Sequence, residues 1–401
     1  MVQAHTYTRV MSGAKSKPGH ESTKAALNTA GAALGDLVSR RESIERLRAE
    51  LDYAEQITKR PVDRDAAERL IKQADSALAR VENDGDAAIL SPGQVSGFEA
   101  VIKTDGSRPV LFVIDGFIDL NQPSVGDFGP RLSVQKEGIQ AVCAAVGRVD
   151  DPSARPLGYQ GTGFMVGQDV VMTNRHVLHA VSRKRDGLVV RDERGVPVLK
   201  DGIAVDFHQE VGPARTDRRF PVARVLFEGA AGALRYRNAD GLNFDTLDMA
   251  LLQLGPVPGQ RMPEPLGSTP RAGVPLAALS SQGQSVHLVG FPGNAQSTTP
   301  DLFSKLFAGV KGFKRLAPGE IMEGPGGLPA GSDPRRWILT HDCSTLGGNS
   351  GSAVVNLDSD GRTTLGLHFA GYHERRNWAH SFLTIGPQVD EILAGRARSP
   401  G

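Results

Sequence analysis

Apolar positions recur at helical spacing in the first part of the chain. Between residues 21 and 56 they are Leu27, Ala30, Leu34, Leu37, Ile44, Leu47, Leu51 and Ala54. Beyond Pro61, with Asp63 as a candidate N-cap, they are Ala67, Leu70, Ile71, Ala74, Leu78 and Val81. Spacings of three and four residues place such side chains on one face of a helix. The pattern predicts a hairpin of two amphipathic helices, preceded by a polar, disordered stretch at 1–20.

The remainder of the chain consists of short apolar runs separated by turn residues. After a linker that ends at Gly93, the runs predict a buried strand at 108–114 and another from Ala141 to Val149. The 401 residues include 47 glycines and 25 prolines, as many short strands joined by turns require. We therefore expect a disordered 1–20, a helical hairpin and linker at 21–95, a strand-containing connector at 96–134 that packs on the next part, and a mostly β domain at 135–397.

A serine lies between glycines late in this β domain, in Gly348-Asn349-Ser350-Gly351. Glycines let the backbone turn so tightly that neighbouring N–H groups can point to one place beside the hydroxyl. A nucleophile beside main-chain donors is what acyl transfer requires. The same tetrad also fits an ordinary turn, so other segments must support this interpretation.

A histidine follows a buried strand in Val170-Val171-Met172-Thr173-Asn174-Arg175-His176-Val177, which comes after the glycine-flanked strand 161–167. A histidine at a strand end can be held rigidly and still face a cleft. Its pKa near neutrality suits it to take up and return a proton. The alternative is that His176 only caps the strand with a hydrogen bond.

An aspartate lies at the head of a third apolar run, Leu247-Asp248-Met249-Ala250-Leu251-Leu252. A buried carboxylate is costly without a donor, and an imidazole N–H is a suitable one. Asp245 is the rival carboxylate, and a turn cap is the alternative role for Asp248. We favour Asp248 because it leads directly into the strand.

The order His176, Asp248, Ser350 is that of chymotrypsin-type peptidases. Together with Val289-Gly290-Phe291-Pro292-Gly293 and Gly366-Leu367-His368-Phe369-Ala370-Gly371, these motifs make residues 135 to 395 resemble a bacterial trypsin-like serine peptidase domain, similar to the glutamyl endopeptidase branch. The resemblance implies two six-stranded antiparallel β-barrels, the chymotrypsin-like double barrel. It also implies Ser350 as nucleophile, His176 as general base and then acid, Asp248 as its orienting partner, and an oxyanion hole at the N–H groups of Gly348, Asn349 and Ser350.

The resemblance extends to the substrate pocket. Its candidate residues are Ser344, Thr345, His368, Phe369, Ala370 and Gly371. Ser344 is uncharged where an aspartate would select Arg or Lys. In the glutamyl endopeptidase branch a threonine and a histidine at the places of Thr345 and His368 hold an acidic side chain. We therefore expect a preference for an acidic residue before the scissile bond.

The expected regulation also follows from the resemblance. Asn349 stands where many animal members have the aspartate that receives a new N-terminus, so no such activating cleavage is implied. Control is instead expected from a regulatory protein on the helical hairpin or from the Gly- and Pro-rich loop at about 294–336. A short likeness of 108–119 to segments before peptidases in bacterial signalling and conflict proteins indicates an effector in antiviral, anti-phage defence.

The overall composition limits the kinds of partner that the chain is expected to bind. Lys and Arg number 46 against 45 Asp and Glu, a net charge of +1, so neither nucleic acid nor a membrane is expected as a partner. The two cysteines, Cys143 and Cys343, whose pairing stays open, and a polar N-terminus indicate a cytoplasmic protein. No cofactor is expected, because no Gly-rich phosphate loop occurs and His341, Cys343, His368, His373 and His380 match no zinc pattern.

The function expected from the sequence is a serine endopeptidase, a hydrolase that forms an acyl-enzyme with its protein or peptide substrate. Two alternatives remain: a triad-bearing peptide-binding or signalling module with little proteolysis, and a hydrolase of non-peptidic acyl groups.

Overall fold

A computed structural model describes residues 2–3, 40–84, 88–104, 108–213, 217–232, 242–267, 273–293, 312–329, 331–345, 347–372 and 376–398. These residues fall into two compact units. The first holds the described residues up to Leu111 and Leu120–Gly129, and the second those of Phe112–Asp119, Pro130–Gln296 and Lys311–Gly401. Residues 4–39, which include most of the predicted disordered stretch and the start of the first helix, lie outside the description.

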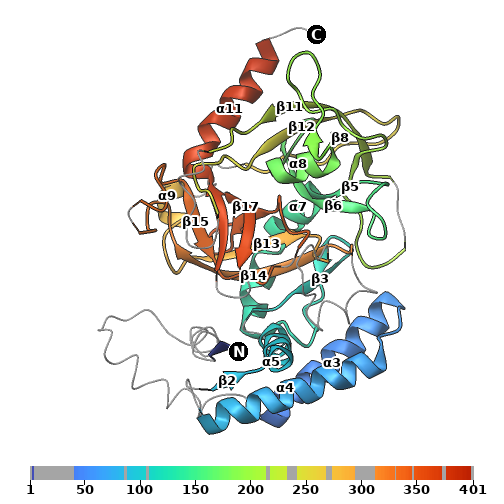
Figure 1. The fold of residues 1–401 in the computed structure, drawn as a ribbon, viewed down its shortest axis with the longest axis vertical. Coiled ribbons are helices and arrows are strands. Elements are labelled where there is room, and N and C mark those ends of the chain that lie inside the picture. The colour runs from blue at the N-terminus through green and yellow to red at the C-terminus, as the bar shows by residue number, and fades with distance from the viewer. Residues whose placement is uncertain are drawn as a thin grey trace. The chain divides into compact units, whose positions relative to one another are not determined.

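The first unit is largely helical (Figure 1). Helices α3 (Arg40–Thr58) and α4 (Arg64–Asp84) confirm the predicted hairpin from Arg40 onward. Their apolar faces supply buried leucines and alanines, and the Arg64 guanidinium donates to Asp52 and Glu55 across the turn. Helix α5 (Pro92–Thr104), which contacts both, was not predicted from the sequence. Strands β1 (Val2–Gln3) and β2 (Ile89–Leu90) pair antiparallel in this unit.

The first barrel of the second unit closes in the order β10-β11-β12-β7-β6-β5. Its strands are β5 (Val146–Asp150), β6 (Tyr159–Gly167), β7 (Val170–Thr173), β10 (Ala204–Asp206), β11 (Arg219–Glu228) and β12 (Ala250–Leu254). All pairs are antiparallel. Gly147 and Gly163 are opposite each other in β5 and β6, and a Cβ at either would lie within 2.6 Å of a valine side chain. Glycine there allows the barrel interior to pack closely.

The second barrel follows the order β13-β16-β17-β18-β15-β14 and closes through pairing of β13 with β14. Its strands are β13 (Ser285–Gly290), β14 (Arg315–Glu323), β15 (Ile338–His341), β16 (Ala353–Asn356), β17 (Thr364–Tyr372) and β18 (Arg376–Ser381). The interior is aliphatic, with Val286, Leu288, Leu339, Val354 and Leu365 among its buried residues. Strands β3 (Leu111–Ile114) and β4 (Phe117–Ile118) extend the sheet beside β14. The predicted double barrel of six-stranded antiparallel barrels is therefore confirmed.

Two sequence expectations near the barrels are only partly right. The predicted strand from Ala141 to Val149 is a strand from Val146 onward, in β5, whereas Ala141 to Ala145 belong to helix α7 (Lys136–Ala145). Strand β14 interrupts the predicted loop at 294–336, of which residues 294–311 lie outside the described residues. Helix α7 packs closely against the main chain at Asp360. Glycine at position 138 permits this approach, because a Cβ there would lie 1.9 Å from the Asp360 carbonyl oxygen. The chain ends in α11 (Phe382–Arg398), whose Arg396 forms a bidentate ion pair with Asp169 at 2.8 and 2.9 Å.

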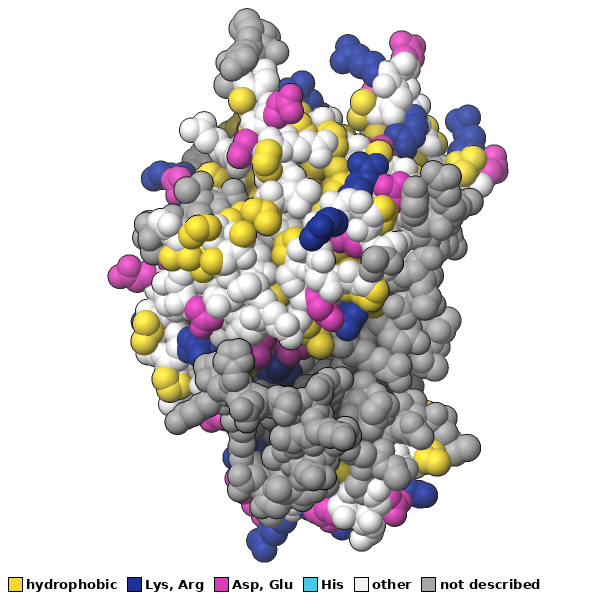
Figure 2. Space-filling model, turned by 90° about the vertical axis from the view of Figure 1, so that its left-hand side faces the viewer, with side chains coloured by type: hydrophobic (Ala, Val, Ile, Leu, Met, Phe, Trp, Pro, Cys, Tyr) yellow, Lys and Arg dark blue, Asp and Glu magenta, His cyan; other side chains and the backbone are white. Residues whose placement is uncertain are grey.

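The described surface in Figure 2 carries basic and acidic side chains interspersed among hydrophobic ones. No helix in the described ranges is both long enough and apolar enough to span a bilayer.

Candidate active site

His176 and Asp248 meet at one end of the first barrel, where strand β7 ends and the neighbouring strand β12 begins. His176 is the second residue of α8 (Arg175–Val181), directly after β7, and Asp248 comes two residues before β12. Because Thr173 of β7 is paired with Ala250 of β12, the two side chains are brought together. His176 Nδ1 lies 2.6 Å from Asp248 Oδ2, and the His176 main-chain N–H donates to Asp248 Oδ1 at 2.9 Å.

The Asp248 carboxylate determines the protonation of this pair. Burial alone would lower the pKa of His176, but the charge of Asp248 and its hydrogen bond outweigh burial and raise that pKa above 6.5. Burial likewise would raise the pKa of Asp248, but the charge and hydrogen bond of His176 lower it. Since an ionised carboxylate only accepts, Nδ1 carries a proton and Nε2 is the basic nitrogen of neutral His176. The His176 side chain is 48% exposed, so Nε2 can reach a substrate.

The Ser350 loop is fixed to the first barrel by Thr162 of β6. The Thr162 N–H donates to the Ser350 carbonyl at 2.9 Å, and its hydroxyl donates to the Gly348 carbonyl at 2.7 Å. Gly348 and Gly351 have φ values of 104° and 91°, which favour glycine. A Cβ at Gly351 would lie 2.0 Å from the Thr162 carbonyl oxygen, so the loop also needs glycine for its close approach.

These contacts leave donors of the loop unengaged. Among the described residues, no acceptor is found for the main-chain N–H groups of Gly348, Asn349 and Ser350, while their carbonyls accept from Thr162 and Ser352. The Ser350 hydroxyl makes no hydrogen bond within the described part of the chain, including to His176. Glycine at position 161 lets the Ser350 loop and helix α8 approach strand β6 closely. A Cβ at Gly161 would lie 3.0 Å from the Ser350 carbonyl oxygen and 2.8 Å from the Val177 side chain.

The family pattern of the trypsin-like peptidase domain matches residues 161–364. A probable serine protease of Lysobacter enzymogenes is 30% identical over 355 residues, which are 83% of this chain and 86% of the relative. The chain belongs to the trypsin-like peptidase family. It is accordingly a serine endopeptidase, as its sequence predicts.

Solved structures of bacterial proteases are similar to this peptidase at lower identity. The inactive form of the Rv3671c protease from M. tuberculosis is 19% identical, with a TM-score of 0.35 over 65% of this chain and 95% of that chain. The serine endoprotease from Yersinia pestis is 15% identical, with a TM-score of 0.38 over 65% of this chain and 66% of that chain. Membership in the family rests on the matched pattern and the Lysobacter relative.

The structure places the candidate pocket residues of this peptidase in two segments. Ser344 and Thr345 follow β15, and His368, Phe369, Ala370 and Gly371 lie on β17. A Cβ at Gly371 would lie 3.1 Å from the Thr345 hydroxyl, so the segments adjoin. The Thr345 hydroxyl donates to Asn377 Oδ1, which leaves Thr345 without a proton to offer a substrate carboxylate in this arrangement.

His368 belongs to a buried histidine pair. Its Nδ1 lies 3.2 Å from Nε2 of His341, and both rings are almost fully buried. Burial, together with the neighbouring His341 and His176, holds the pKa of His368 well below 6.5, and burial lowers that of His341 to about 3. Within the described residues, His341 Nδ1 has no partner. A lone pair there costs less than an unpaired N–H, so the favoured tautomers have His341 Nε2–H donating and His368 Nε2 protonated.

The sequence did not identify Glu228, which binds two residues of the His176 helix and Arg191 outside it. The carboxylate of Glu228, at the end of β11, accepts from Arg175 at 3.0 Å, His179 at 2.6 Å and Arg191 at 2.7 Å. Burial alone would raise the pKa of Glu228, but hydrogen bonds from Arg191 and His179 and the charges of Arg191 and Arg175 lower it to about 2. Glu228 therefore remains ionised at all ordinary pH values.

His380 was considered only as a metal ligand, yet its Nε2 accepts the Asp248 main-chain N–H at 3.0 Å. No group of three His, Cys, Asp or Glu in the described ranges could hold a metal ion, and His373 lies outside them. Cys143 and Cys343 are buried thiols and are not paired with each other. Asp245, the rival of Asp248, instead accepts from the Arg335 guanidinium at 2.6 Å.

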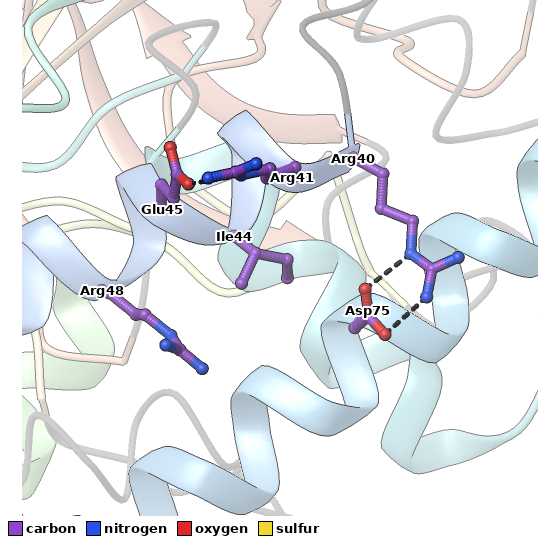
Figure 3. Close-up of a pocket in the computed structure, with 6 residues that line it drawn as sticks. All are labelled: Arg40, Arg41, Ile44, Glu45, Arg48 and Asp75. Carbon is purple, nitrogen blue, oxygen red and sulfur yellow. Dashed lines mark hydrogen bonds and ion pairs between the residues drawn. The ribbon is translucent and has the colours of Figure 1, made fainter.

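A separate hollow of about 480 Å³ lies in the helical unit. It is lined by Arg40, Arg41, Ile44, Glu45, Arg48 and Asp75 (Figure 3). Arg40 forms a bidentate ion pair with Asp75, and Arg41 pairs with Glu45. This hollow contains none of the candidate catalytic residues.

Proposed function

We propose that His176, Asp248 and Ser350 form the catalytic triad of this endopeptidase. The observation that carries the proposal is the double contact of Asp248 with the His176 ring and main chain. This contact fixes the tautomer in which Nε2 is the base, and Thr162 anchors the Ser350 loop to the same barrel.

The reaction then proceeds in two halves. Ser350 Oγ attacks the scissile carbonyl carbon while His176 Nε2 takes the hydroxyl proton, and the carbonyl becomes a tetrahedral oxyanion. The C–N bond breaks, His176 returns the proton to the departing amine, and the acyl group stays on Ser350. A water molecule, deprotonated by His176, attacks the acyl carbon, and Ser350 leaves as the protonated hydroxyl.

The N–H groups of Gly348, Asn349 and Ser350, which find no acceptor among the described residues, support an oxyanion hole at this loop. Main-chain donors that bind a developing negative charge commonly contribute a hundredfold or more in rate each. The hydrogen bond from the Thr162 hydroxyl to the Gly348 carbonyl supports the oxyanion hole further, because it opposes rotation of the peptide that carries the Asn349 N–H.

The test compares the wild-type protein with Ser350→Ala on a bacterial proteome, followed by sequencing of newly formed peptide N-termini. New N-termini with wild type alone would support the proposal, and an equal set with Ser350→Ala would contradict it. The second candidate function is a peptide-binding module with little proteolysis. It is favoured by the missing Ser350–His176 hydrogen bond. That module would bind peptides without producing any new N-termini.

We further propose that the peptidase prefers an acidic residue before the scissile bond. The support is the His341–His368 pair, whose favoured tautomers give His368 an Nε2–H for a substrate carboxylate. His368 is neutral when empty, so it offers a hydrogen bond, and the bound carboxylate would then raise its pKa. Thr345 contributes only if its hydroxyl turns away from Asn377.

A peptide library tests this preference. A buried hydrogen bond to a charged group contributes about 1.5–3 kcal/mol, so His368→Phe should reduce the ratio of kcat/KM for Glu over Gln substrates roughly tenfold to a hundredfold. His287→Phe, which removes another buried histidine, is the control and should leave the ratio unchanged. A wild-type profile without enrichment of Glu or Asp would end the proposal.

The biological setting is also proposed. An effector role in anti-phage defence rests on the likeness of residues 108–119, and a cytoplasmic location rests on the two-cysteine composition. The Arg-lined hollow of α3 and α4 is proposed to receive a regulatory protein, since Arg48 there makes no hydrogen bond or ion pair with the described residues. If Arg48→Glu changes neither phage resistance nor partner capture in cells, that docking role is wrong.

A further inference from the structure

His380 contacts the main chain of Asp248 from the second barrel. It lies on β18, whereas Asp248 precedes β12 of the first barrel. The Asp248 N–H donates to His380 Nε2 at 3.0 Å, and the imidazole is fully buried. Phe369 stacks on the ring, with centroids 4.5 Å apart and planes at 20°, and Trp337 presents an edge contact at 5.2 Å. The two aromatic contacts fix the plane in which the Nε2 lone pair points.

The contact also fixes the tautomer of His380. Because Asp248 donates, Nε2 must be unprotonated and the proton must lie on Nδ1. Nδ1 is buried and has no partner among the described residues. Burial outweighs the nearby Asp248 charge and lowers the pKa of His380 to about 4, so the ring is neutral at ordinary pH. A phenylalanine would fill this space without an unpaired donor, so what the imidazole adds is the acceptor for Asp248.

Asp248 is consequently held on both sides of its Cα. Its carbonyl accepts from Asn174 Nδ2 at 2.9 Å, and its N–H donates to His380. Between these two contacts, its carboxylate makes both bonds to His176. Loss of the His380 contact would leave the partly buried N–H of Asp248 without its acceptor and free the peptide that sets the direction of the carboxylate.

We propose that His380 is a positioning residue for the reaction: it fixes the Asp248 main chain so that the carboxylate keeps the His176 ring in its active orientation. The proposal rests on the triad of the proposed function. His380 acts through Asp248, so its removal lowers kcat and leaves KM nearly unchanged.

Three variants test this role. His380→Phe keeps a ring of similar shape and removes the acceptor; a misplaced catalytic group commonly costs on the order of a hundredfold, so kcat should fall about tenfold to a hundredfold. His380→Gln places an amide oxygen near the lost Nε2 and should recover kcat to within about threefold of wild type. His287→Phe is the matched control, because His287 is also fully buried, bonds through Nε2 to a main-chain oxygen and has no partner for Nδ1 in the described part of the chain. Its kcat should equal that of wild type.

A spectroscopic readout separates failure of this inference from failure of the proposed function. In wild type, nitrogen NMR should report His380 protonated at Nδ1 and coupled through the hydrogen bond to the Asp248 amide. The low-field proton of His176 Nδ1 should weaken or shift upfield in His380→Phe and not in His287→Phe. A wild-type protein without peptide turnover would refute the proposed function alone. His380 protonated at Nε2, or a folded His380→Phe with unchanged kcat and low-field proton, would overturn the positioning role.

Discussion

The substitution Glu228→Gln removes the carboxylate charge that binds Arg175, His179 and Arg191. Glu228 is 13% exposed, and its pKa of about 2 compares with an ordinary value of 4.5. At about 1.4 kcal/mol for each pH unit, the difference corresponds to roughly 3 kcal/mol of unfolding free energy at neutral pH. Arg191 is 38% exposed, so solvent screens part of this interaction and the measured loss should be about 1.5–3 kcal/mol.

The sign of the pH dependence follows from the lowered pKa. The native carboxylate binds protons less readily than the unfolded one, so the stabilisation is complete above pH 4.5 and is lost as the pH falls toward 2. At pH 3 the difference in unfolding free energy between wild type and Glu228→Gln should therefore be less than half of the difference at pH 7.

Urea unfolding followed by circular dichroism at pH 7 and pH 3 measures both quantities. Glu264→Gln is the control, because Glu264 pairs with Arg261 on the surface, where the side chains are 78% and 89% exposed. That variant should lose less than about 0.5 kcal/mol. A loss below about 0.5 kcal/mol for Glu228→Gln, or a gap equal at the two pH values, would refute the reasoning.

Three further predictions concern the site. Thr162→Val should lower kcat roughly tenfold, because the Gly348 carbonyl loses its donor; unchanged kcat in a steady-state assay would argue against the anchoring role. Gly351→Ala should abolish activity and destabilise the fold in thermal unfolding, because its φ is 91° and its Cβ would lie 2.0 Å from the Thr162 carbonyl oxygen; a fully active variant would contradict this. The kcat/KM of wild type should fall as the pH drops through the His176 pKa, which lies above 6.5, because the protonated ring cannot act as a base. Asp248→Asn should move this fall in kcat/KM to lower pH, and an unchanged pH dependence would contradict the pairing of His176 with Asp248.

The family and the barrel architecture could be predicted because their evidence is local in sequence. The segments around His176, Asp248 and Ser350 each combine a strand with a chemically specific residue, so pattern and order were sufficient. Short apolar runs were less informative. In 141–149, a run of alanine, valine and cysteine fits either a strand or a helix, and close packing of α7 against Asp360 favours the helix. Helix α11 was not predicted from the sequence, and it contains Pro387, a residue that is unfavourable inside a helix.

The contacts that support the site could not be predicted. His380 lies 132 residues from Asp248, and Glu228 lies about 50 residues from the helix it binds. Their partners are main-chain or common charged groups, so neither residue forms a local pattern. Only the closure of the barrels brings them beside the triad candidates, and this depends on strand pairing that a single sequence does not specify.

The central claim is that His176, Asp248 and Ser350 act as one unit, and the rate of active-site labelling tests it most directly. A fluorophosphonate probe followed by peptide mass spectrometry should place the adduct on Ser350 in wild type. His176→Ala and Asp248→Asn should slow labelling by about a hundredfold or more while remaining folded. An adduct on another residue, or labelling of Asp248→Asn at the wild-type rate, would contradict the account.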